Sequence, residues 1–162
     1  MAWSRLRARW RELLAPSVAR RVNVHMAGYR EAYERRGRAW LAIDGRPMAT
    51  FCEFTFENAW RDQGRREGAT DRPFTDSAHA AIREAGARDK ADLLDALGTC
   101  IGQPVDALLA SRDPLVRALA RLDRRLGRRR LAKWEPVDEP DLVVALHRLR
   151  YETEKAARQR SP

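Results

Sequence analysis

Arginine is the residue type in this sequence that is best suited to bind a ligand. The chain has 162 residues, with 32 Lys and Arg against 23 Asp and Glu, and its formal net charge is +9. Of these basic residues 29 are Arg and 3 are Lys, and the guanidinium group favours bidentate contacts with phosphate. Seven arginines close together in sequence are the candidate binding residues: Arg117, Arg121, Arg124, Arg125, Arg128, Arg129 and Arg130. They predict a non-catalytic basic module that binds an anionic partner, with nucleic acid as the first candidate.

Two other interpretations of these arginines stay open. A run of charges often serves only to solvate a helix face, where cations also interact favourably with the C-terminal end of the helix dipole. A basic face can also dock an acidic protein, as a protein-interaction module or an immunity-like accessory factor would. The charge is uneven, because residues 1–50 carry +7, residues 51–110 carry −4 and residues 111–162 carry +6. Such basic ends either meet on one face or are neutralised by the acidic middle.

Cysteine and histidine are the other residue types that could support chemistry. Cys52 and Cys100 are 48 positions apart, which is neither a local metal-binding spacing nor a disulfide framework. His25, His79 and His147 are isolated in the sequence, so no metal and no cofactor are expected. An enzyme with a convergent Cys/His site is the second alternative, and it would need Cys52 to meet a base such as His25 in the fold. The cysteine usage fits a reducing, cytoplasmic location.

Aromatic residues in and beside the predicted sheet are candidates for a stacking surface. They are Tyr29, Tyr33, Trp40, Phe51 and Trp60. An aromatic side chain on an open sheet face can stack on a nucleobase. Aromatic residues among alternating aliphatic ones more often belong to a core, and this packing interpretation is favoured here.

The first part of the sequence predicts a helix followed by a small sheet. Apolar residues recur at helical spacing over residues 3–14. The pattern then changes to short apolar runs near 22–26, 40–43 and 48–52. Asp44-Gly45 separates the last two runs and is typical of a type I′ hairpin turn, because both residues tolerate a positive φ. Three antiparallel strands are therefore expected.

The rest of the sequence predicts helices. Capping residues and periodicity place them at 55–67, 76–85, 89–97, 104–110, 113–126 and from 141 onward. Over 113–126 leucines and arginines fall on opposite faces, and the last helix continues an apolar stripe toward Tyr151. The expected fold class is α+β, with an N-terminal helix, a three-stranded antiparallel sheet and several C-terminal helices that cover it. We expect one domain, 1–162, with a helix-sheet-helix half (1–67) and a mostly helical half (76–159), and no membrane span.

Three motifs resemble one known family. They are the start Trp3-Ser4-x-Leu6, the hairpin Gly37-Arg38-x-Trp40-x-x-x-Asp44-Gly45, and the run Leu122-Asp123-Arg124-Arg125-Leu126-Gly127-Arg128-Arg129-Arg130-Leu131. Together they are similar to a family of uncharacterised small bacterial proteins, and the resemblance spans most of the chain. It implies a single bacterial cytosolic domain and brings no assigned activity, cofactor or catalytic residue.

Overall fold

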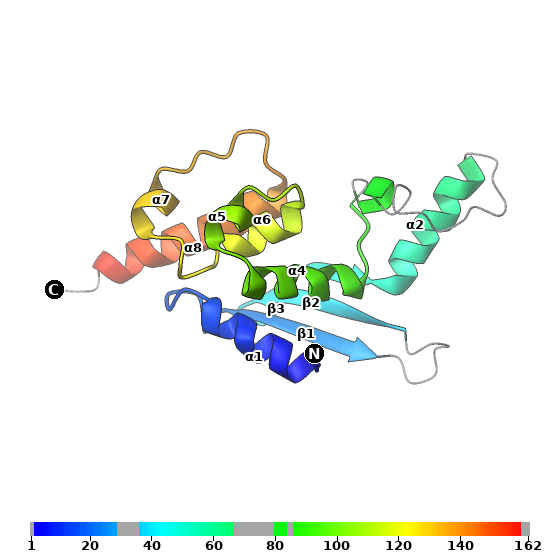
Figure 1. Ribbon diagram of the computed structural model, residues 1–162, viewed down its shortest axis with the longest axis horizontal. Helices are drawn as coiled ribbons and strands as arrows, with labels where there is room; N and C mark the ends of the chain where they lie inside the picture. The colour runs from blue at the N-terminus through cyan, green and yellow to red at the C-terminus, as the bar shows by residue number, and fades with distance from the viewer. Residues whose placement is uncertain (1, 29–35, 67–79, 84–85, 160–162) are drawn as a thin grey trace. The chain divides into compact units, whose positions relative to one another are not determined.

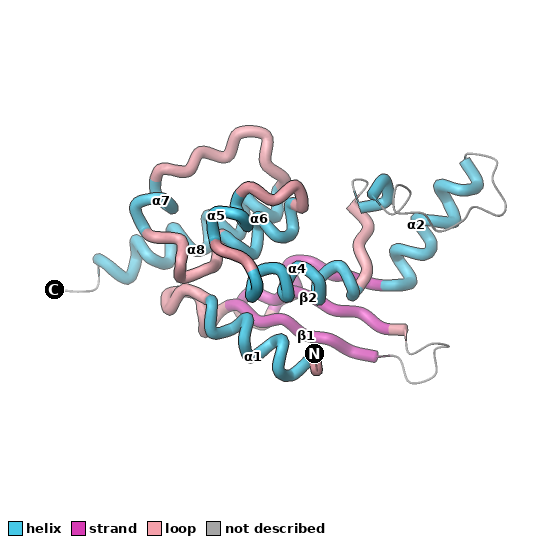
Figure 2. The backbone as a smooth tube through the Cα atoms, in the orientation of Figure 1, coloured by secondary structure: helices cyan, strands magenta, loops and turns pink. Residues whose placement is uncertain are grey.

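A computed structural model describes residues 2–28, 36–66, 80–83 and 86–159 of the chain (Figure 1). In chain order it has one helix, three strands and a series of helices (Figure 2), so the predicted α+β class is confirmed. Most of the helix expected at 76–85 lies outside the described residues, as do Tyr29, Tyr33 and His79. Within the described ranges, no helix is both long enough and apolar enough to cross a membrane.

Helix α1 (Trp3–Leu13) is amphipathic, as predicted. It buries Leu6 and Trp10, which are 8% and 1% exposed. After the helix the chain becomes extended, and Leu14 forms an antiparallel bridge with Asp123. This bridge joins the N-terminal segment to a part of the chain that is distant in the sequence.

The sheet contains β1 (Val22–Gly28), β2 (Gly37–Ile43) and β3 (Arg46–Cys52), hydrogen-bonded in that order. Its three strands are antiparallel. Alternate residues of β1 and β2 are buried, among them Val22, Val24, Ala39 and Leu41. Between β2 and β3, Asp44 and Gly45 have φ angles of 51° and 80°. Two successive positive φ angles are the signature of a type I′ turn, and the predicted hairpin is confirmed.

Helices follow the sheet: α2 (Glu53–Arg66), α4 (Lys90–Gly102), α5 (Val105–Leu109), α6 (Pro114–Ala120), α7 (Arg128–Ala132) and α8 (Asp141–Gln159).

Helix α2 begins before its predicted cap, Thr55. Cys52 supplies the acceptor instead, because its sulfur is hydrogen-bonded by the backbone at Thr55. Helix α4 continues past its predicted end at Leu97. Gly98 costs the helix only about 1 kcal/mol relative to alanine, and burial of Leu97 and Cys100 offsets this.

The predicted helix over residues 113–126 is correct at its start and wrong at its end. As expected, the Asp113 carboxylate caps α6 by accepting the Leu115 N–H at 2.9 Å. The helix ends at Ala120, and residues 121–127 form turns before α7 begins. The arginines that were predicted to share one helix face are therefore divided among α6, these turns and α7.

The extended segment after α1 explains the early end of α6. The Leu122 carbonyl accepts the Ala15 N–H at 2.8 Å, and the Arg124 N–H donates to the Leu13 carbonyl at 2.7 Å. A continuing helix would need that carbonyl and that N–H for its own hydrogen bonds. The pairing with residues 13–15 takes both groups, and no local periodicity reveals it.

The fold consists of two compact units. Unit 1 comprises Met1–Asn23, Ala42–Arg46 and Leu94–Pro162, and unit 2 comprises Val24–Leu41 and Pro47–Leu93. Unit 1 has 21 basic and 12 acidic residues, whereas unit 2 has 11 of each. The whole net charge of +9 therefore belongs to unit 1, which contains both basic ends of the sequence.

Leucines form most of the core of unit 1. Helix α8 packs against α6 and α7, and α6 also packs against α5. The leucines that are 2% exposed or less in these elements and turns are Leu108, Leu115, Leu119, Leu122, Leu126, Leu131 and Leu146. Beyond Leu146 the buried residues of α8 are Arg150 and Glu154. The predicted continuation of the apolar stripe to Tyr151 is wrong, because Tyr151 is 41% exposed.

Candidate nucleic-acid interface

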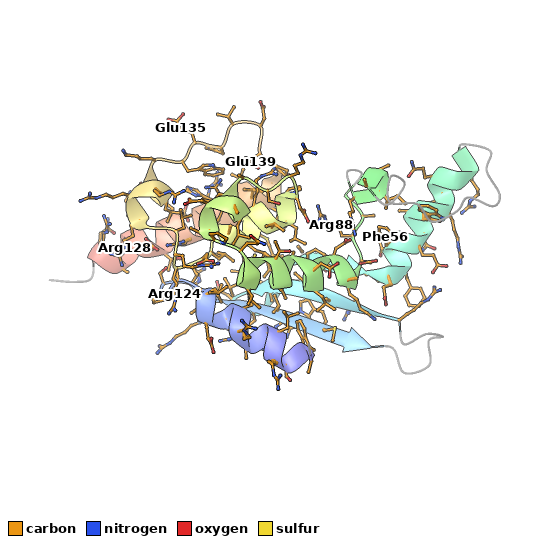
Figure 3. All side chains as sticks on the ribbon, viewed as in Figure 1. Phe56, Arg88, Arg124, Arg128, Glu135 and Glu139 are labelled. Carbon is orange, nitrogen blue, oxygen red and sulfur yellow. The ribbon has the colours of Figure 1, made fainter. Side chains whose placement is uncertain are left out.

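Three of the seven predicted binding arginines make their main contacts inside unit 1. Arg117 on α6 forms a bidentate ion pair with Glu139, in which Nε donates to Oε1 at 3.2 Å and Nη2 donates to Oε2 at 2.8 Å. Glu139 lies in the segment between α7 and α8 (Figure 3). Arg121 is 5% exposed, and its guanidinium carbon lies 4.0 Å from the centre of the Trp134 ring. Burial lowers the pKa of Arg121, although the charge of Glu139 opposes this shift.

Arg125 is the third of these arginines. Its Nε and Nη2 donate to the Asp123 carboxylate at 3.0 Å and 2.6 Å, and its remaining donors reach the carbonyls of Cys100 and Gln103 at 2.8 Å and 3.0 Å. The hydrogen bonds to Asp123 raise the pKa of Arg125. Asp123 itself is 3% exposed. In this arrangement Arg125 holds α4 and the turns after α6 together and has few donors left for an external ligand.

The other four arginines lie at the surface around α7. Arg124 and Arg129 are exposed, and neither pairs with an acidic side chain among the residues that the structure describes. Arg128 has 60% of its side chain exposed, and its Nε lies 3.4 Å from Oε2 of Glu154 on α8. Arg124 and Arg128 are labelled in Figure 3. Arg130 pairs with Asp106, but both side chains are more than half exposed, and such surface pairs contribute little.

A groove lies between α7 and the C-terminal half of α8. It has a volume of about 280 Å³ and is lined by Arg128, Leu131, Ala132, Tyr151, Glu154, Lys155 and Arg158. We call it the α7–α8 groove. Its three cations are exposed, whereas its carboxylate, Glu154, is already paired with the buried Arg150 at 2.9 Å. Arg128 shares Glu154 with Arg150, and Lys155 and Arg158 have no ion-pair partner among the described residues, so the groove carries a net positive charge beside apolar side chains.

Tyr151 brings an aromatic ring to this groove. The ring lies parallel to that of His147, with 6.1 Å between their centres and an interplanar angle of 12°. His147 in turn lies 4.3 Å from Trp134, on whose ring Arg121 rests. Residues 147 and 151 are one turn apart on α8 and share a face. His147 therefore contacts both Trp134 and Tyr151, and Tyr151, at the end of this row, is 41% exposed and lines the groove.

A second cleft adjoins the α7–α8 groove and shares Arg128 and Glu154 with it. It has a volume of about 200 Å³, and Ser17, Arg124 and Arg150 are also in its lining. The Ser17 hydroxyl is buried and has no hydrogen-bond partner in the described part of the chain. The exposed Arg124 extends the basic surface beyond the groove into this cleft.

Among the residues that the structure describes, Cys52 and His25 of the Cys/His alternative do not meet. Cys52 is partly buried at the end of β3. Burial raises the pKa of its thiol, but hydrogen bonds from Thr55 outweigh this and the net pKa lies below its ordinary value. His25 stacks on Trp40, with ring centres 5.1 Å apart, and within the described ranges no contact links it to Cys52. In those ranges, no group of three His, Cys, Asp or Glu residues could hold a metal ion.

Sequence reasoning missed three residues of the groove: Tyr151, Lys155 and Arg158. The periodicity of the last helix assigned Tyr151 to the core and did not single out the other two. The signal that could have found them is their own spacing of four and three residues, which places all three on one helix face. Of the aromatic residues weighed as a stacking surface, Phe51 is instead buried in the core.

Comparison with known proteins gives a family but no characterised relative. The model of the SF0329 protein family matches residues 2–151, which is nearly the whole chain. No curated protein and no solved structure matches it. The family match agrees with the resemblance inferred from the sequence motifs, and the chain belongs to the SF0329 protein family.

Proposed function

We propose that this chain is a non-catalytic module that binds nucleic acid through the exposed cations around the α7–α8 groove. We call these cations the basic cluster: Arg124, Arg128, Arg129, Arg130, Lys155 and Arg158. The observation that carries the proposal is that two mostly buried carboxylates of unit 1, Glu139 and Asp123, pair with its inner arginines. Arg117 and Arg125 have bidentate carboxylate partners, whereas Arg124 and Arg129 have no ion-pair partner among the described residues. Phosphate groups would supply the missing partners.

The charge distribution supports the same proposal. Unit 1 carries the entire net charge of +9, and a field of one sign attracts a polyanion from a distance. Each phosphate that a Lys or Arg neutralises releases condensed counterions, so the affinity depends on salt. In this arrangement the arginines contact phosphate oxygens as planar forks, and Lys155 acts as a point charge.

Binding to nucleic acid, followed as a function of salt, tests the proposal. The nuclease-treated protein is titrated with labelled single-stranded DNA, duplex DNA and duplex RNA. We expect the logarithm of the binding constant to fall linearly with the logarithm of salt concentration, with a slope of roughly −0.7 to −0.9 for each phosphate contacted. Reversing three charges in the variant Arg124→Glu, Arg128→Glu, Arg129→Glu should weaken binding by about tenfold or more and flatten this slope.

A matched control separates the position of the charge from its amount. The variant Arg5→Glu, Arg9→Glu, Arg112→Glu makes the same charge change at exposed residues that line neither the groove nor the adjoining cleft. Equal loss of affinity in both variants would contradict the basic cluster as the binding surface. Absence of nucleic-acid binding at physiological salt, with specific binding of an acidic protein through the same residues, would replace nucleic acid by the alternative partner class.

A further inference from the structure

We infer that the nucleic acid bound at the α7–α8 groove is single-stranded, and that one of its bases stacks on Tyr151. This inference rests on the proposed function and goes beyond it, because it names the form of nucleic acid that the groove selects. It is carried by the position of an exposed aromatic ring among exposed cations, which outnumber the single carboxylate of the groove.

Exposed cations lie next to the Tyr151 ring in the α7–α8 groove. Tyr151 is 41% exposed and lines the same groove as Arg128, Lys155 and Arg158. Lys155 follows Tyr151 by one turn of α8, and Arg158 by about two turns, so the three share a face. An aromatic ring beside cations that track a backbone is the arrangement by which proteins hold single strands.

The α7–α8 groove is small. A volume of about 280 Å³ lies just below the range of roughly 300–1,000 Å³ that is typical of small-molecule sites. The groove therefore has room for about one nucleotide. In a duplex both faces of each internal base are covered by neighbouring bases, so along its length Tyr151 can reach a base face only in an unpaired strand.

Neighbouring rings restrict the movement of the Tyr151 ring. His147 lies parallel to Tyr151, Trp134 supports His147, and Arg121 covers Trp134 at 4.0 Å. A ring that is already held in place loses little freedom when a base stacks on it, which favours binding. The buried Arg121 lies at the far end of this row and is not in the lining of the groove.

An abasic strand separates stacking from phosphate contact. The full-length protein is titrated with three labelled probes: a short oligothymidylate, an abasic deoxyribose-phosphate strand of the same length, and a DNA hairpin duplex. We expect the oligothymidylate to bind more tightly than the other two. Tyr151→Leu should weaken oligothymidylate binding roughly fivefold or more and leave the abasic strand and the duplex unchanged. Tyr151→Phe should retain the binding, because it keeps the ring.

A second measurement uses the unmodified protein and does not depend on how a variant folds. An oligonucleotide that contains 5-iodouracil is photocrosslinked to the wild-type chain, and the attachment site is mapped by mass spectrometry. Crosslinking at Tyr151 supports the inference. Crosslinking only elsewhere, or equal weakening of oligothymidylate and abasic strand in Tyr151→Leu, would overturn it. Preferential duplex binding would also overturn it but leave the proposed function standing, whereas failure of all three probes to bind would remove both.

Discussion

At the scale of single residues, Arg150 connects α8 to the turns that carry part of the basic cluster. Its side chain is 3% exposed and pairs with Glu154, from Nε to Oε1, at 2.9 Å. Nη1 donates to the carbonyls of Arg121 and Asp123 at 3.1 Å and 2.5 Å, and Nη2 donates to the carbonyl of Leu126 at 2.6 Å. One guanidinium group therefore satisfies three carbonyls that no helix satisfies, and it fixes the path of the chain from α6 to α7.

Removing this guanidinium group should destabilise unit 1. We expect Arg150→Leu to lower the free energy of unfolding by about 3–5 kcal/mol, because it leaves the buried Glu154 without its partner. Arg150→Lys should recover only part of the loss, since an ammonium group cannot reproduce the planar fork. Urea unfolding measures both. Arg148→Leu, at an exposed position of the same helix, is the control and should change stability by less than about 0.5 kcal/mol. Equal midpoints for the Arg150 and Arg148 variants would contradict this role.

His147 predicts how stability depends on pH. Burial lowers its pKa from 6.5 to about 4, and the charges of Arg121 and Arg150 add to the shift. Between these two values the unfolded chain binds a proton that the folded chain does not, so stability falls as the pH is lowered through this window. Thermal unfolding at a series of pH values should show this decline, and His147→Gln should reduce it. A variant that kept the full decline would assign the pH dependence to other groups.

At the scale of elements, the structure confirms those predictions whose causes are local. The Asp44-Gly45 turn and the Asp113 cap depend on adjacent residues, and the sequence displays those residues directly. The end of α6 at Ala120 depends on hydrogen bonds to residues 13–15 and on Arg150, which are far away along the chain. Periodicity reports what a segment would do alone, and here the tertiary contacts override it.

The same reason limits how much of the site could be predicted. The sequence pointed to the correct region, since four of its seven arginines belong to the basic cluster. It could not separate Arg121 from Arg124, because only the fold puts one against Trp134 and leaves the other in solvent. The exposure of Tyr151 was likewise not predicted, because it depends on how α7 and α8 pack on either side of the groove.

A close approach between β1 and β2 gives a prediction for the sheet. A Cβ atom at Gly37 would clash with the carbonyl oxygen of Ala27, whereas a Cβ atom at Gly28 would meet open space. We expect Gly37→Ala to destabilise the protein by about 1–3 kcal/mol. Gly28→Ala should be neutral or stabilise it by up to about 1 kcal/mol, because alanine restricts the unfolded chain. Urea unfolding distinguishes them, and similar losses in both variants would contradict the close approach at Gly37.

At the scale of the whole molecule, charge is divided twice. It is divided between the units, since unit 1 carries +9 and unit 2 is neutral. Within unit 1 it is divided again, because carboxylates that are mostly buried pair with the inner arginines, as Glu139 does with Arg117 and Asp123 with Arg125. Of the outer arginines, Arg124 and Arg129 have no ion-pair partner among the described residues, Arg128 shares Glu154 with Arg150, and Arg130 pairs with the exposed Asp106. This second division predicts that arginines close in sequence have separable roles.

Two triple variants with the same charge change should separate these roles. Neutralising the outer set, Arg124→Gln, Arg128→Gln, Arg129→Gln, should weaken nucleic-acid binding and leave the melting temperature nearly unchanged, because the buried Glu154, which Arg128 contacts, keeps its ion pair with Arg150. Neutralising the inner set, Arg117→Gln, Arg121→Gln, Arg125→Gln, should cost several kcal/mol of stability, because Glu139 and Asp123 lose their partners. Its folded fraction should bind with nearly the wild-type affinity.

Binding and thermal unfolding of both variants are measured on the same preparations, at a temperature where the inner variant is still folded. Loss of affinity in the folded inner variant would place the inner arginines in the binding surface. Unfolding of the outer variant would mean that Arg124, Arg128 or Arg129 supports the fold. Either result would contradict the division of roles, because equal numbers of positive charges are removed in the two sets and only their partners differ.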